Sequence, residues 1–136
     1  MAVIRAGARA TKVAPAQSFT GQVWQDEVIV GTSPSRMRAT NVSFSPGART
    51  AWHAHPVGQT LFVISGVGRL QIEGEPVQEL RPGDTGVIPP DTRHWHGAAS
   101  DSFFVHLAMS ETDDNGGGTQ WYELVSDEDY AASPSY

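Results

Sequence analysis

The middle of the chain alternates short apolar segments with turn residues. Val28-Ile29-Val30 and Leu61-Phe62-Val63-Ile64 are examples of the apolar runs, while Pro46-Gly47 and Pro82-Gly83 are examples of the turns. Runs rich in Val, Ile and Phe between such turns are typical of strands, and no amphipathic helix is predicted among them. We therefore predict an all-β sandwich or barrel with strands at 21–30, 36–45, 49–55, 59–64, 69–73, 77–80, 85–88, 93–96 and 102–109.

The two ends differ from this middle part. Residues 1–18 are expected to form a loosely structured arm with one strand at 2–4, because the Ala-Pro-Ala run at 14–16 breaks any helix. Residues 19–125 are expected to form the barrel, including a final strand at 119–125. Within residues 126–136, a short helix should begin after Ser126 as N-cap, have acids in its first turn and end near Ser133-Pro134.

Composition narrows the choice of function. The 136 residues suffice for one domain with a single core. Cysteine is absent, so a metal would have to use imidazole and oxygen donors. The net charge of −6 argues against nucleic-acid binding. No apolar run approaches the ~18 residues of a membrane span, and the basic, Ala-rich start lacks the apolar core of a secretory signal. We therefore expect a cytoplasmic protein with no membrane partner.

Charge is unevenly distributed along the chain. Arg5, Arg9 and Lys12 precede the first acid, whereas Arg93 is followed by eight acids and no further Lys or Arg. Two solvated ends would explain this pattern. Alternatively, the basic and acidic ends attract each other, within one chain or between two chains.

The candidate chemistry lies in two H-x-H pairs, His53/His55 and His94/His96. Side chains two positions apart on a strand share a face, with their Cα atoms roughly 6.5–7 Å apart, so two imidazoles can converge on one ion. Gln59 adds an amide oxygen just beyond a turn. A single pair would be compatible with ordinary hydrogen-bonded histidines, but two pairs together with Gln59 favour a metal site.

The spacing of these residues resembles the two conserved motifs of the cupin superfamily. The resemblance implies a double-stranded β-helix, the jelly-roll barrel, with one divalent metal held by His53, His55, Gln59 and His94. Gln59 stands where the family usually has Glu, Asp91 where it has Gly, and Ala98 where it has Asn. The matching residues are Gly47, His53, His55, Gln59 and Gly66 for the first motif, and Gly83, Pro89 and His94 for the second.

Longer runs resemble the bacterial manganese-dependent cupin hydroxynitrile lyases: R-T-A-W-H-A-H-P-V-G-Q-T-L, H-W-H-G-A-A and W-Y-E-L-V-S-D-E-D-Y. This resemblance implies cleavage or formation of cyanohydrins, Mn²⁺ as cofactor with Fe²⁺, Zn²⁺, Ni²⁺ and Co²⁺ as alternatives, and a homodimer or homotetramer. It places Thr50, His96 and His106 beside the metal, with a histidine as the base. Strand parity supports His96, but it puts Thr50 opposite His53 unless a bulge intervenes. For His106, a buried histidine satisfied by the backbone is the alternative.

Gln59 influences which reaction we favour. A neutral amide leaves a divalent ion with its full charge, which strengthens its Lewis acidity and stabilises a trivalent state less well. A metal-dependent lyase is therefore preferred over a dioxygenase acting on a small aromatic or enolic substrate. A polyketide-cyclase-like or non-catalytic ligand-binding cupin is a further alternative.

Small or apolar residues on inward strand faces are expected to line the substrate pocket. For Phe62 and Phe104, ordinary core packing is the alternative, and Thr40 and Val42 are included mainly through the resemblance. The expected wall residues are Thr40, Val42, Trp52, Phe62, Val87 and Phe104.

Overall fold

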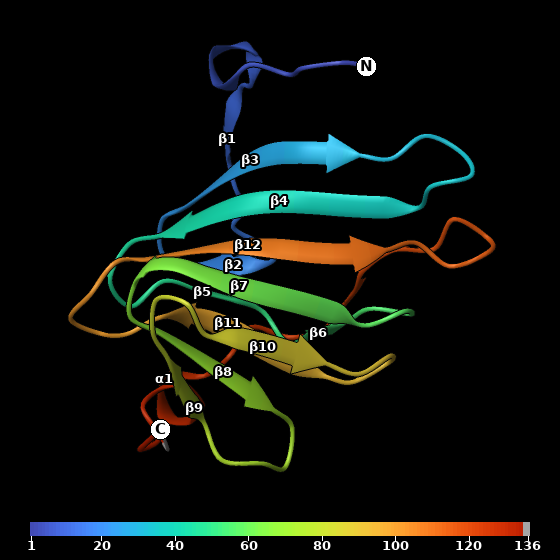
Figure 1. The fold of residues 1–136 in the computed structure, drawn as a ribbon. Coiled ribbons are helices and arrows are strands. Elements are labelled where there is room, and N and C mark those ends of the chain that lie inside the picture. The colour runs from blue at the N-terminus through green and yellow to red at the C-terminus, as the bar shows by residue number, and fades with distance from the viewer. Residues whose placement is uncertain (135–136) are drawn as a thin grey trace.

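Two antiparallel sheets face each other in the computed structural model, which describes residues 1–134 (Figure 1). The six-stranded sheet has the order β1 (Thr11–Val13), β3 (Val23–Val30), β4 (Met37–Phe44), β12 (Phe104–Glu111), β7 (Gln59–Gly66) and β10 (Thr85–Ile88). The long central strands β4, β12 and β7 form one wall of the molecule. This all-β jelly-roll arrangement confirms the predicted fold class.

The opposite, seven-stranded sheet is built from shorter strands. Along its main path lie β13 (Gln120–Trp121), β6 (His53–Ala54), β11 (His94–Ala98), β5 (Arg49–Thr50) and β2 (Phe19–Thr20). Strand β8 (Gly68–Ile72) pairs with β11, and β9 (Gln78–Leu80) pairs with β8. His53, His94 and His96 therefore lie on strands of this sheet, and His55 follows directly after β6.

Alternation along the central strands creates the core between the sheets. Leu61 and Val63 on β7 point inward and are buried, and Phe104 on β12 is fully buried beside Phe44 of β4, with ring centroids 5.8 Å apart. Each such side chain contributes about 1.5–3 kcal/mol through burial. A second apolar cluster, comprising Trp52, Val77, Trp95, Val125 and Tyr130, involves the C-terminal segment.

One glycine brings two strands of the site into contact. A Cβ added at Gly97 of β11 would lie 2.5 Å from the Ala48 carbonyl oxygen and 2.6 Å from the Arg49 Cα. Only a residue without a side chain permits this approach. It places β11, with its histidines, directly against β5, which carries Thr50.

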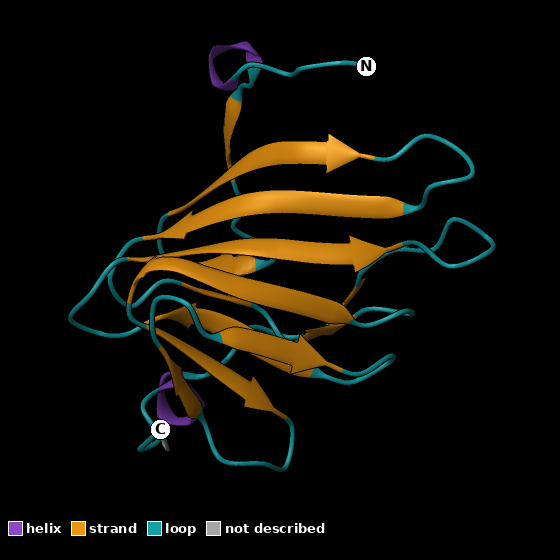
Figure 2. Ribbon diagram, viewed as in Figure 1, coloured by secondary structure: helices purple, strands orange, loops and turns teal. Residues whose placement is uncertain are grey.

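The predicted strand at 2–4 is absent. Residues Ala6–Ala8 form the short 3₁₀ helix η1, and the first strand of the arm is β1, which is antiparallel to β3 (Figure 2). Residues 2–4 are exposed, so no neighbouring strand provides partners for their backbone.

The expected strands at 49–55 and 119–125 are shorter than predicted. The first is divided into β5 and β6, and the second is reduced to β13, because its residues 122–125 leave the sheet. The C-terminal helix is confirmed as α1 (Asp127–Tyr130), although it ends before Ser133-Pro134. The Ser126 hydroxyl accepts the Asp129 N–H at 3.1 Å, as an N-cap should.

Acids of the C-terminal half pair with arginines of the body of the fold. Asp127 contacts Arg49 at 2.7 Å, and Glu123 contacts Arg93 at 2.6 Å. These pairs attach the C-terminal segment to the seven-stranded sheet. Within residues 1–134, no helix has the length and apolar character needed to cross a membrane.

Candidate functional site

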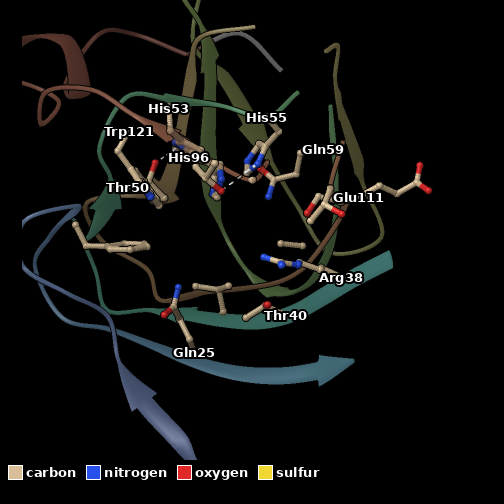
Figure 3. A pocket seen from close by; sticks show the side chains of 17 residues that line it. Gln25, Arg38, Thr40, Thr50, His53, His55, Gln59, His96, Glu111 and Trp121 are labelled. Carbon is tan, nitrogen blue, oxygen red and sulfur yellow. Dashed lines mark hydrogen bonds between the residues drawn. The ribbon is translucent and has the colours of Figure 1, made fainter. Parts of the chain in front are cut away.

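A cavity of about 190 Å³ opens between the two sheets (Figure 3). One wall comes from β4 and β12 of the six-stranded sheet, and the other from β5, β6 and β11. The segment 118–121 borders the cavity as well. Its lining includes His53, His55, Gln59, His96, Thr50, Thr40, Val42, Arg38, Ser110, Thr119 and Trp121.

His53 and His94 are held in the same way. Each Nδ1 donates a hydrogen bond to the carbonyl oxygen two residues earlier, Ala51 or Thr92, at 2.9 Å. This fixes the tautomer and leaves a lone pair on each Nε2. The two residues are direct partners across β6 and β11, with ring centroids 4.2 Å apart. They therefore present two metal-binding nitrogens side by side.

His55 and Gln59 complete this cluster. His55 Nδ1 lies 3.3 Å from the Thr119 hydroxyl, and its Nε2 is buried with no hydrogen-bond partner in residues 1–134. Gln59 Oε1 lies 3.3 Å from His94 Nε2. Since His94 carries its proton on Nδ1, both of these atoms are acceptors. A cation between them would satisfy both.

The second pair adds a fourth imidazole. Ring nitrogens of His53, His94 and His96 all lie within 4.8 Å of one another. His96 Nδ1 is 3.0 Å from His106 Nε2, whereas His96 Nε2 and His106 Nδ1 are buried without a partner among the described residues. The backbone N–H of His96 also donates a hydrogen bond to Thr50 Oγ1 at 3.2 Å. The break in the strand after Thr50 removes the parity conflict, so Thr50 faces the cavity with His53.

Burial keeps all five histidines neutral at physiological pH. It is the main cause that lowers the pKa of His55 and His94 to about 4 and that of His106 to about 3. Burial, followed by repulsion from neighbouring histidines, lowers the pKa of His53 and His96 well below the usual value. Neutral imidazole is the form that binds a metal or accepts a proton.

These donors fit a divalent metal ion. The buried His55 Nε2 and His96 Nε2 lack a partner among the described residues, the Gln59 amide oxygen faces His94 Nε2, and no carboxylate belongs to the histidine group. Imidazole and carbonyl-type oxygen suit Mn²⁺, Fe²⁺, Co²⁺, Ni²⁺ and Zn²⁺. The three-histidine group can hold a metal, and His55 and Gln59 lie beside it.

The predicted wall residues divide into two sets. Thr40 and Val42 line the cavity from β4. The other four predicted wall residues do not line this cavity. Phe62 and Val87 are 42% and 68% exposed, because Leu61, Val63 and Ile88 take the inward positions. Phe104 belongs to the main core and Trp52 to the second cluster.

Several lining residues were not predicted from the sequence, among them Phe19, Arg38, Thr119 and Trp121. Trp121 packs against His53 with ring centroids 4.8 Å apart, and Phe19 packs against Trp121 at 5.6 Å. Thr119 contacts His55, and Arg38 enters the cavity from β4 (Figure 3). Only the tail motif containing Trp121 gave a signal, because the other three come from segments whose apolar pattern is weak.

Comparison with known sequences identifies the family. The profile of the family described as Cupin domain matches residues 40–109. The chain belongs to the cupin family. It is 45% identical over 130 residues to an (R)-mandelonitrile lyase from Granulicella tundricola, covering 96% of this chain and 98% of that protein.

Solved structures share the fold. A cupin-like protein from Thermotoga maritima has a TM-score of 0.82 and 39% identity, covering 87% of this cupin and 89% of that chain. The polyketide cyclase RemF from Streptomyces resistomycificus has a TM-score of 0.73 at 16% identity, covering 96% and 90%. At that identity the second similarity concerns the fold alone.

Proposed function

We propose that this cupin is a metal-dependent lyase that cleaves and forms cyanohydrins. The observation that carries the proposal is the His96–His106 hydrogen bond, in which His96 also has a ring nitrogen within 4.8 Å of ring nitrogens of His53 and His94. It places a neutral base next to a Lewis-acid site, which is the combination that this reaction needs. The 45% identity to an (R)-mandelonitrile lyase supports this choice.

His53, His55, Gln59 and His94 would hold one divalent ion, with Mn²⁺ our first choice. When bound, it supplies Lewis-acid polarisation of a substrate oxygen. Gln59 is neutral, so these four ligands leave the ion its full positive charge. His96 is assigned to the base because its Nδ1 partner is a second imidazole that can share a proton, whereas His53 and His94 are bonded to backbone carbonyls.

The histidine pair would move the proton. His96 Nε2 takes the proton of the cyanohydrin hydroxyl, and the positive charge spreads to His106 through the Nδ1–Nε2 hydrogen bond. As the oxygen forms the carbonyl, the C–CN bond breaks, and cyanide leaves and takes up the proton that His96 Nε2 had accepted, so the histidine pair returns to its neutral form. Cyanohydrin is thereby converted to aldehyde and hydrogen cyanide. The lowered pKa values of His96 and His106 ensure that the pair starts neutral.

Thr50 would position one reacting group. The Thr50 oxygen accepts a hydrogen bond from the backbone N–H of His96 at 3.2 Å, so the hydroxyl proton of Thr50 is free to be donated into the cavity. A nitrile nitrogen or a hydroxyl oxygen is a suitable acceptor. Val42, Phe19 and Trp121 supply apolar wall around it.

Release of benzaldehyde from mandelonitrile tests the proposal. The purified protein should release it, and treatment with a chelator should abolish the release. Oxygen uptake with an enolic substrate, without benzaldehyde release at any metal loading, would instead identify a dioxygenase. Absence of both reactions, with a metal tightly bound, would leave a polyketide-cyclase-like or ligand-binding cupin.

We further propose that the chain forms a homodimer or homotetramer. Phe62, Ile64 and Val87 on the outer face of the six-stranded sheet are 42%, 48% and 68% exposed. Apolar side chains grouped on one sheet face are typical of a protein–protein interface. Light scattering after size exclusion tests this, and a mass of 14.6 kDa, that of one chain, would contradict it.

A further inference from the structure

Arg38 is a solvent-exposed cation on the wall of the cavity that the proposed reaction does not use. Its guanidinium group points from β4 into the cavity, toward the side on which Gln59 lies (Figure 3). Within residues 1–134, its side chain forms no ion pair and no hydrogen bond. The nearby Arg36, in contrast, pairs with Asp114 outside the cavity.

Strand register fixes where Arg38 lies relative to the histidines. Arg38 pairs with Ser110 of β12, and Ser110 pairs with Gln59 of β7. With neighbouring strands ~4.8 Å apart, the Cα atoms of Arg38 and Gln59 are roughly 10 Å apart on one row of the sheet. Thr40 continues the same face of β4 toward Val42, which pairs with His106. This face of β4 thus runs from the Arg38 guanidinium toward the histidine group.

The surroundings keep the guanidinium available. A Cβ added at Gly118 would lie 3.8 Å from Arg38 Nη1, so the chain passes beside the group at a residue that has no side chain to cover it. Ser110 and Thr112 add hydroxyls to the lining near it. Glu111 borders the cavity as well, but it pairs with Met37 and so has the opposite strand parity to Arg38.

We propose that Arg38 binds a carboxylate at the far end of the substrate, so that the natural substrate is a small hydroxy or oxo acid, such as the cyanohydrin of a carboxylate-bearing aldehyde. The planar fork of an arginine matches a carboxylate with two parallel hydrogen bonds. A guanidinium without a protein partner on a cavity wall has this capacity free. The cyanohydrin part of this inference rests on the proposed function; the carboxylate subsite does not.

Binding of short ligands to the Mn²⁺-loaded protein tests the subsite without catalysis. Titration calorimetry compares 3-hydroxypropanoate, 4-hydroxybutanoate and 5-hydroxypentanoate with their neutral amides. We expect at least one acid to bind about tenfold more tightly than its amide. Arg38→Gln should remove this preference, and Arg38→Lys should retain part of it, because a charge without the fork remains.

Arg36→Gln is the matched control. It removes the same charge two residues away, where the guanidinium pairs with Asp114, and it should leave the preference intact. Equal binding of acids and amides at every length would overturn the proposal. A preference that survives in Arg38→Gln would also overturn it, since the carboxylate would then lie on the metal.

The same ligands separate this inference from the lyase proposal. A carboxylate preference that depends on Arg38, in a protein that never cleaves mandelonitrile, supports the subsite and contradicts the lyase. Cleavage of mandelonitrile without any carboxylate preference supports the lyase and contradicts the subsite.

Discussion

The two H-x-H pairs have the same spacing but different hydrogen-bond partners. His53 and His94 each donate from Nδ1 to a backbone carbonyl, and His55 contacts the Thr119 hydroxyl. His96 alone is joined to another imidazole, that of His106. Three of the four histidines are therefore oriented by groups that do not titrate near neutral pH, whereas the fourth can share a proton. The partners of a ring, more than its position in a motif, distinguish a ligand from a base.

Metal content should distinguish the ligand histidines from the base most clearly. His53→Ala and His94→Ala should lower bound metal from about one ion per chain to almost none, because each removes a directly coordinating nitrogen. His96→Ala should retain the metal and lose mandelonitrile cleavage. Mass-spectrometric metal analysis of folded variants measures this.

His55→Ala is the partner experiment. It should also lose the metal if His55 is a ligand. Metal retained in His55→Ala but lost in His96→Ala would show that the ion is held by His53, His94 and His96. The roles of the two pairs would then have to be exchanged.

His106→Asn should slow cleavage while leaving the metal in place. Loss of the residue that shares the proton with the base is expected to reduce kcat by about 10²–10⁴-fold. Steady-state rates and metal content are measured together. A kcat within twofold of the wild-type value would assign His106 to core packing beside Phe44 and Phe104.

Metal-free protein should lose stability below pH 6.5. The unfolded chain protonates its histidines near pH 6.5, whereas in the folded chain the pKa values of His55 and His94 are about 4. The unfolded state therefore binds more protons between these values, and the free energy of unfolding falls as pH falls. Each histidine contributes a slope of up to about 1.4 kcal/mol per pH unit. Urea unfolding from pH 7 to pH 4 measures it, and constant stability would contradict the burial of these rings.

Thr119→Val should have the smallest effect. It removes the hydroxyl that contacts His55 Nδ1 at 3.3 Å, and loss of such a partner lowers metal affinity by about tenfold, the lower end of the usual range. Thr112→Val, on the same segment but without a hydrogen bond to a histidine, is the control. Equal metal affinity in both variants would show that Thr119 does not orient His55.

The positions of the histidines could be predicted from the sequence more accurately than the residues that form the pocket walls. The period-2 rule correctly placed His94 and His96 on one face, because β11 is a regular strand. The same rule failed for Thr50, since the chain leaves the sheet between β5 and β6. Phe62 and Val87 were assigned inward positions, yet the neighbouring Leu61 and Ile88 occupy them. In an apolar run, the inward set depends on register, which the partner strands determine.

The contacts that bring Trp121 and Arg38 to the cavity could not be predicted from the sequence. Trp121 reaches His53 only because β13 pairs with β6 across a separation of more than sixty residues. Arg38 lies in a weakly alternating segment, and its row with Ser110 and Gln59 follows from the pairing of β4, β12 and β7. Such juxtapositions are properties of the sheet and not of any local pattern.

The dependence of cleavage on bound metal tests the central claim most directly. The protein is stripped with a chelator, reloaded with increasing Mn²⁺, and assayed for benzaldehyde release from mandelonitrile at each measured occupancy. We expect no release at zero occupancy and a rate that rises in proportion to bound metal up to one ion per chain. Full activity in the stripped protein, or none at full occupancy, would contradict it.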